Sequence, residues 1–135
     1  MTRSRRRNPL VLIVDPDADV RAALADFLVE AFRVEPAGSA REALSYLEEH
    51  TVHAVIAEAK LPDHYAPGFF LEIRRRLPRA ILVATYPYGE DLEVQEPRLR
   101  HIVDFSLSKP FDIQRLESTL LDMIQRLNRS AQEGA

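Results

Sequence analysis

The sequence predicts an α/β fold in which an open parallel sheet of five strands carries helices on both faces. Short, continuous apolar runs alternate along the chain with longer segments whose apolar residues recur at helical spacing. Runs that are apolar throughout are typical of parallel strands covered on both sides. Because a helix follows each strand, the strands should be linked by right-handed crossovers. With 135 residues, the chain has room for one domain of ordinary size.

The first half of the chain supplies three strands and two helices of this pattern. The strands are expected at residues 10–14, 34–37 and 52–57. A first helix is expected over residues 19–32, where five apolar residues fall on one helical face: Val20, Leu24, Phe27, Leu28 and Ala31. Ser39 and Glu42 form a capping-box pattern, in which the hydroxyl and the carboxylate each satisfy a free amide. The second helix should therefore begin here, with its inward side formed by Ala43, Leu44 and Leu47.

The second half continues the alternation. Strands are expected at residues 81–84 and 102–107, and a third helix at residues 68–77, where Pro78 stops it. Three arginines near the end of that helix, residues 74–76, should turn their outer members to solvent, with Glu72 nearby. Asp112 should cap the last helix, whose buried stripe comprises Ile113, Leu116, Leu120, Met123 or Ile124, and Leu127.

The fourth helix is the irregular element of the pattern. It should lie between Thr85 and Ile102, yet Pro97 would cost about 3 kcal/mol inside a helix. We therefore expect this helix to be short, irregular or displaced. The whole arrangement is flavodoxin-like, with strand order 2-1-3-4-5. In such sheets the functional site lies beyond the carboxyl ends of the strands, where the first and third strands diverge.

Composition and charge bound the domain organisation and the class of partner. Residues 1–9 are expected to form a basic flexible arm, residues 10–128 the domain and residues 129–135 a C-terminal tail. The net charge of -3 gives no reason for general nucleic-acid binding. No apolar run approaches the ~20 residues of a membrane helix, so we expect a cytoplasmic protein without membrane contacts. The absence of cysteine excludes disulfides and thiol chemistry.

Four polar residues close the apolar strands and carry a resemblance to a known family. Asp15, Glu58, Thr85 and Lys109 follow the first, third, fourth and fifth strands. In this order and spacing, nearly the whole chain resembles the receiver domain of bacterial two-component response regulators. The resemblance places Glu58, which is followed by three residues and then a proline, at the position of the aspartate that accepts the phosphoryl group. It makes Thr85 the switch hydroxyl and Lys109 the partner of the acceptor, before a cis proline.

Several residues of this pocket depart from the family pattern. An extra methylene moves the carboxylate of Glu58 by about 1 Å, a shift that can cost about a hundredfold in rate. Pro16 replaces the second acidic metal ligand, and Ser106 replaces the switch aromatic, while Phe105 should face the opposite side of its strand. Asp17 is expected to cap the first helix, with a role as a substitute metal ligand as the alternative.

These departures predict a degenerate pocket. Magnesium binding should be weak or absent, with Asp15 and Glu58 as its only ligands, and we expect no other metal and no cofactor. Lys109 should form a partly buried ion pair with Glu58 or Asp15. The expected function is a phosphorylation-independent, receiver-like signalling module that acts through protein contacts.

The expected contact surface runs from Glu90 to Leu127, because the family meets partners through its fourth helix, fifth strand and fifth helix. Its apolar members would be Leu92, Val94 and Leu99. The partner would be a protein, with a histidine kinase or another signalling protein as candidates and a homodimer as a further assembly.

Two alternatives to this function stay open. The first is a working single-domain receiver that a histidine kinase phosphorylates on Glu58, Asp17 or Asp63. The second is a phosphatase of the haloacid dehalogenase type, since Asp15 and Asp17 lie two residues apart after an apolar strand. Asp19 stands where those enzymes carry threonine or valine, and no strand-borne acidic pair follows Lys109. We therefore expect no enzymatic activity.

Overall fold

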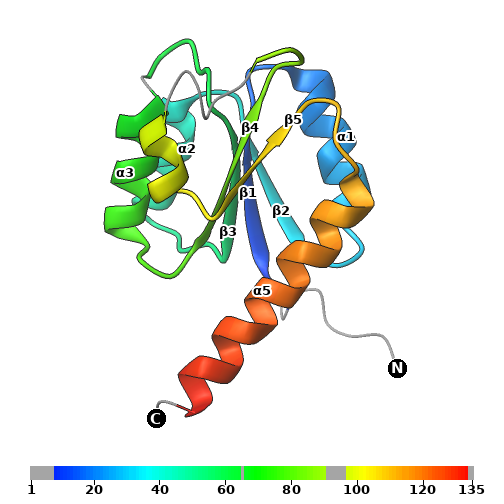
Figure 1. The fold of residues 1–135 in the computed structure, drawn as a ribbon, viewed down its shortest axis with the longest axis vertical. Helices are drawn as coiled ribbons and strands as arrows, with labels where there is room; N and C mark the ends of the chain where they lie inside the picture. Colours follow the sequence, from blue (N-terminus) through cyan, green and yellow to red (C-terminus); the bar gives the residue numbers. More distant parts are fainter. Residues whose placement is uncertain (1–7, 65, 91–96, 134–135) are drawn as a thin grey trace.

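The computed structural model describes residues 8–64, 66–90 and 97–133, which fold around a single sheet in the order β2-β1-β3-β4-β5 (Figure 1). Every neighbouring pair of strands is parallel. The fold class and strand order predicted from the sequence are therefore confirmed. The strands are β1 (Leu10–Val14), β2 (Arg33–Ala37), β3 (Ala54–Glu58), β4 (Ile81–Tyr86) and β5 (Phe105–Ser108).

Helices cover both faces of this sheet (Figure 1). One face packs against α1 (Ala18–Leu28) and α5 (Ile113–Glu133). The other packs against α2 (Ala40–Leu47), α3 (Ala66–Arg76) and the short 3-10 helix η2 (Pro97–His101). Each face has its own hydrophobic core, because the side chains of a strand alternate between the two sides. The central strands β1, β3 and β4 are thus buried on both sides, as their continuous apolar runs predicted.

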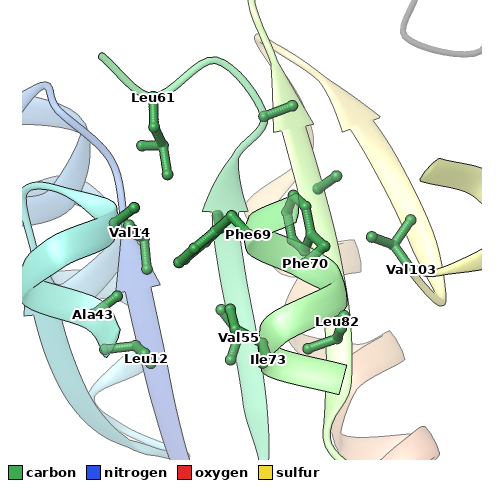
Figure 2. Close-up of a cluster of buried hydrophobic side chains, with 14 of the residues drawn as sticks. Leu12, Val14, Ala43, Val55, Leu61, Phe69, Phe70, Ile73, Leu82 and Val103 are labelled. Carbon is green, nitrogen blue, oxygen red and sulfur yellow. The ribbon is translucent and has the colours of Figure 1, made fainter. Parts of the chain in front are cut away.

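The core beneath α2 and α3 shows how the helices are fixed on the sheet (Figure 2). Phe69, Phe70 and Ile73 of α3 are fully buried and lie over Val55 and Leu82 of the central strands. Burying each such side chain contributes roughly 1.5–3 kcal/mol. This packing holds the loop between β3 and α3, and with it one wall of the site.

Helix α1 ends earlier than the apolar spacing predicted. It stops at Leu28 instead of residue 32, and the amides of Ala31 and Phe32 both donate to the carbonyl of Leu28 in a tight turn. That turn buries Phe32, whereas Phe27 is 39% exposed. Phe32 lies four residues after Leu28, so its position matches helical spacing although it belongs to the turn after α1.

The segment between β4 and β5 is irregular, as expected. Pro97 begins η2, where its missing amide breaks no helical hydrogen bond. Leu99 is buried in the core, so its prediction as a surface contact residue is wrong. β5 begins only at Phe105, because the amides of Ile102 and Val103 donate to the Leu99 carbonyl. Residues 91–96, which include Leu92 and Val94, lie outside the described residues.

Helix α5 extends beyond the rest of the domain at the end where the strands begin (Figure 1). It runs to Glu133, past residue 128, where the sequence placed the end of the domain. Its buried stripe is Leu116, Leu120 and Ile124, while Leu127 is 39% exposed. Among the helices of the described chain, none combines the length and the hydrophobicity needed to span a bilayer.

Candidate functional site

A buried cluster of two carboxylates and one ammonium group lies at the carboxyl end of the sheet. Lys109 donates through Nζ to Asp15 Oδ2 at 2.7 Å and also to Glu58 Oε2. Asp15 is 2% exposed and Glu58 is 5% exposed. The predicted ion pair of Lys109 is confirmed, and it bridges both acids instead of choosing one.

The sheet register brings these side chains together. Val14, the residue before Asp15, pairs with Ala57, the residue before Glu58. Glu58 pairs with Thr85 on the other side, and β5 ends at Ser108, directly before Lys109. Parallel strands all end at the same edge of a sheet, so four residues far apart in sequence reach one place.

Asp15 is held by hydrogen bonds on every side. Its Oδ1 accepts the amide of Asp17 at 2.8 Å, and its own amide donates to the carbonyl of Ala37 at 3.1 Å. The guanidinium of Arg21 donates to the Asp15 carbonyl at 2.6 Å. These contacts tie the β1 end to α1 and β2, so the carboxylate has little freedom to reorient.

Glu58 occupies a less balanced environment. Burial raises the pKa of Glu58, the hydrogen bond and charge of Lys109 lower it, and the carboxylates of Asp15 and Glu90 raise it further, with a net upward shift. Its Oε1 is buried and has no hydrogen-bond partner among the described residues. One oxygen of this carboxylate thus accepts a hydrogen bond from Lys109, and the other accepts none from the described residues.

Lys109 carries the compensating charge. Burial lowers its pKa, but the hydrogen bonds and charges of Asp15 and Glu58 outweigh burial and raise the pKa overall. Lys109 therefore stays cationic at neutral pH. The peptide bond between Lys109 and Pro110 is cis, as the resemblance implied.

A second ion pair borders the cluster and was not predicted from the sequence. Lys60, two residues after Glu58, donates to Glu90 Oε1 at 2.5 Å. Lys60 is 55% exposed and Glu90 is 28% exposed, and Glu90 Oε2 is buried with no partner among the described residues. The pair joins the loop after β3 to the loop after β4, and only the fold reveals that contact.

Two nearby acids serve as helix caps. Asp17 accepts the amides of Asp19 and Val20 at the start of α1, at 2.9 and 3.4 Å, which confirms the predicted cap. Asp63 accepts the amides of Ala40 and Arg41 at the start of α2, at 3.0 and 2.9 Å. The hydrogen bond from Arg41, helped by the one from Ala40, holds the pKa of Asp63 below its usual range, although burial acts in the opposite direction.

The predicted capping box of α2 forms with one change of partner. Ser39 Oγ accepts the amide of Glu42 at 3.1 Å. The carboxylate of Glu42 reaches back to the amide of Gly38, at 2.9 Å. With Asp63, three side chains therefore satisfy free amides around this helix end.

The residues at the family's two switch positions, Thr85 and Ser106, lie on neighbouring strands. Thr85 is 2% exposed beside Glu58. Ser106 is partly buried and pairs with Ala84, and Phe105 packs against the opposite core beneath α1 and α5. Phe105 therefore faces the other side of the sheet, as its place in the strand predicted. Pro16 is exposed in the loop between Asp15 and Asp17.

The donor set of the pocket bears on metal binding. Within residues 8–64, 66–90 and 97–133, no group of three or more His, Asp or Glu side chains is placed to hold a metal ion. The two carboxylates at the strand ends each give an oxygen to Lys109. Magnesium prefers hard oxygen ligands in near-octahedral array, and in this pocket both candidate carboxylates are already engaged by one ammonium group.

Comparison with known families and proteins agrees with this geometry. A model of the response regulator receiver domain matches residues 11–121. Response regulator Rre1 of Synechocystis sp. is 29% identical over 132 residues, covering 93% of this chain and 55% of that protein. Hydrogenase transcriptional regulatory protein HoxA of Bradyrhizobium diazoefficiens is 24% identical over 115 residues, covering 85% of this chain and 24% of that protein. The chain thus spans about half of the first relative and about a quarter of the second.

Solved structures share the fold. A CheY-like receiver domain protein from Methanospirillum hungatei superposes with a TM-score of 0.81 at 22% identity, covering 91% of this chain and 98% of that one. NtrX from Brucella abortus, in complex with ADP, superposes with a TM-score of 0.82 at 21% identity, covering 95% of this chain and 30% of that one. At these identities the likeness shows the fold.

Proposed function

Because this chain belongs to the response regulator receiver domain family, we propose that it is a receiver-type signalling module whose output does not depend on phosphoryl transfer. The observation that carries the proposal is the Lys109 bridge. One ammonium group already joins Glu58 and Asp15 within a buried cluster. Lys109 therefore supplies, from within the chain, a positive charge beside the two carboxylates that a working receiver would place around a metal ion.

The position of the Glu58 carboxylate supports this proposal. Formation of an acyl phosphate needs in-line attack, and a nucleophile displaced by about 1 Å can lose about a hundredfold in rate. Glu58 carries one methylene more than the aspartate at this position in the family, and its Oε2 is held by Lys109. The side chain is thus both longer and already bonded.

The loop after β1 supports it as well. Pro16 supplies no carboxylate, and Asp17, the nearest acid, is bonded to the amides at the start of α1. Without a metal ion, Lys109 is the cation left to offset the charge that accumulates on a transferring phosphoryl group, and it is already paired with Asp15 and Glu58. The same cap takes Asp17 away from the general acid and base role that a phosphatase of the haloacid dehalogenase type would require.

Signalling would then occur through contact with a protein partner. The proposed surface runs from Glu90 to Leu127 and includes η2, β5 and α5. With Leu99 buried, its described part on η2 is polar, and Arg98, Arg100 and His101 are exposed. A partner with acidic groups, or a second copy of this chain, would fit this face.

A working receiver is the second candidate, and one observation favours it. Glu58 Oε1 is buried and has no hydrogen-bond partner among the described residues, so one carboxylate oxygen is free to act as a nucleophile. On this alternative a histidine kinase phosphorylates Glu58, with Asp17 and Asp63 as further acceptors.

Phosphorylation assays separate the two candidates. The protein is incubated with radiolabelled acetyl phosphate and Mg²⁺, and acyl-phosphate label is identified by its release with hydroxylamine. We expect no label on the native chain or on Glu58→Asp, and label on the double variant Pro16→Asp/Glu58→Asp, which serves as the positive control. Stoichiometric label on the native chain that disappears in Glu58→Gln, Asp17→Asn or Asp63→Asn would overturn the proposal and identify the acceptor.

A further inference from the structure

A groove at the amino-terminal end of the sheet, far from the Lys109 cluster, has no role in the function proposed above. It consists of two adjacent hollows of about 490 and 350 Å³, which share Pro78, Arg79, Ala80 and Leu127. We call it the base groove. One wall is the turn between α3 and β4, and the other is the part of α5 that extends past the sheet (Figure 1).

The floor of the base groove is apolar. The first hollow is lined by apolar side chains from the segment before β3, from the turn between α3 and β4, and from α5: Val52, Leu77, Ala80, Ile124, Leu127 and Ala131. Leu127 is 39% exposed although it continues the buried stripe of α5. Both volumes fall in the range of about 300–1,000 Å³ that is typical of ligand pockets, and neither hollow is closed. The groove can therefore accept apolar side chains of another molecule.

The rim of the base groove is cationic. Four arginines and one aspartate line the two hollows: Arg74, Arg76, Arg79, Arg126 and Asp104. His53, in the first hollow, contributes no positive charge at neutral pH, because burial and the nearby Arg33 lower its pKa.

Two of these arginines are available to a partner. Arg79 is exposed and makes no ion pair with any described residue. Among the described residues, Arg126 forms its ion pair with Asp122, and both side chains of that pair are more than half exposed. By contrast, Arg74 is occupied by Asp104 and by backbone carbonyls.

From this combination we propose that the base groove binds an acidic amphipathic segment of a partner protein. Its apolar side chains would fill the two hollows, and its carboxylates would pair with Arg79 and Arg126. The phosphates of a nucleic acid would pair with the arginines but would leave the apolar floor unfilled. A membrane surface would not enter the concave hollows. The inference is independent of the Glu58 pocket, which lies at the other end of the sheet.

A peptide selection tests this proposal. A randomised display library of 16-residue peptides is selected on the native chain and counter-selected on the double variant Arg79→Glu/Leu127→Gln. We expect the enriched peptides to combine apolar residues with Asp and Glu, and a synthetic enriched peptide to shift the amide signals of Val52, Ala80 and Asn128 saturably. No enrichment, peptides without an acidic bias, or shifts confined to the amides near Lys109 would overturn the proposal.

Single variants then separate the contributions of charge and apolar contact. Arg79→Glu and Leu127→Gln should each weaken peptide binding about tenfold or more, because each removes an exposed side chain that would contact the peptide. A tenfold loss of affinity corresponds to about 1.4 kcal/mol. Arg115→Glu, the same charge change at the opposite end of α5, should leave the affinity within about twofold. Displacement of the peptide by an oligonucleotide or by anionic vesicles, equally well from the native chain and from Leu127→Gln, is a further outcome to check. That result would overturn the proposal, because the ligand would then need only the arginines. Self-association that Arg79→Glu abolishes would overturn it in favour of a dimer.

Discussion

Two acids near the carboxyl end of β3, Glu58 in its last position and Asp63 in the loop that follows, lie in opposite environments. Glu58 is buried beside Lys109, and burial raises its pKa. Asp63 is exposed at the start of α2, and backbone amides lower its pKa. Neutralising a buried carboxylate requires a dedicated cation, whereas an exposed one needs only free amides at a helix end. The difference explains why Glu58, and not Asp63, is paired with a lysine.

The largest expected effect comes from removing that lysine. Lys109→Met leaves Asp15 and Glu58 buried without a counter-charge, and breaking such a cluster costs about 3 kcal/mol or more. We expect the free energy of unfolding, from urea titrations at pH 7, to fall by this amount. Part of the loss should be recovered at lower pH, as Glu58 becomes protonated. A change below about 1 kcal/mol at pH 7 would mean that the cluster is solvated, like a surface pair.

The cap at Asp63 should contribute less. Asp63→Ala removes the acceptor for the amides of Ala40 and Arg41, and loss of a helix cap typically costs about 1 kcal/mol. Ser39→Ala, which removes the other cap of α2, gives a matched comparison. If neither variant shifts the urea midpoint, the helix end does not depend on these side chains.

The pH dependence of stability should have opposite signs for the two acids. The pKa of Asp63 is lowered by folding, so its contribution is present above the ordinary pKa of aspartate and is lost as pH falls through its folded pKa. The pKa of Glu58 is raised by folding, so its contribution is present below the ordinary pKa of glutamate and is lost as pH rises through its folded pKa.

Urea midpoints measured between pH 3 and 8, a window of about five units around the reference carboxyl pKa values, test these signs. Relative to the native chain, Asp63→Asn should lose stability as pH rises, and Glu58→Gln should gain it. Equal slopes for the two variants would contradict the contrast drawn above.

The smallest effect is expected at the partly exposed pair beside the cluster. Lys60→Met breaks the contact with Glu90, in which Lys60 is 55% exposed and Glu90 28%, and ion pairs near the surface contribute about 0–1 kcal/mol. Because Lys60 and Lys109 bind carboxylates at neighbouring loops, the ratio of their effects isolates burial as the cause. A loss for Lys60→Met equal to that for Lys109→Met would remove that explanation.

The sequence predicted the sheet well because its central strands, β1, β3 and β4, are nearly continuous apolar runs with a polar residue at or near the end. Asp15, Glu58 and Lys109 could be assigned to one site from the sequence alone, since the ends of parallel strands converge. Helix ends were less predictable. Phe32 is buried by a turn but continues the spacing of α1, and Leu99 is buried on η2 although it was predicted to lie on the contact surface.

Contacts between loops and between distant side chains were missed for a different physical reason. Lys60 and Glu90 carry no local signal, because their pairing depends on how two loops meet. Arg74 belonged to a run of three arginines whose outer members were expected in solvent, yet the middle one, Arg75, is the most exposed, at 76%. Arg74 turns inward and donates to the carbonyls of Ala80 and Ile102. From the sequence alone, a charged side chain is predicted to face solvent, because the carbonyls that it can reach are known only once the fold is known.

The central claim is that Glu58, Pro16 and Lys109 act together to keep the pocket from accepting a phosphoryl group. No single substitution should therefore restore phosphoryl chemistry. The most direct test adds Mg²⁺ and beryllofluoride to isotopically labelled protein and follows the amides near Asp15, Glu58, Thr85 and Lys109. The account predicts no saturable shifts for the native chain or for Glu58→Asp, and saturable shifts for Pro16→Asp/Glu58→Asp. Saturable shifts in the native chain at submillimolar Mg²⁺, or in Glu58→Asp alone, would contradict it.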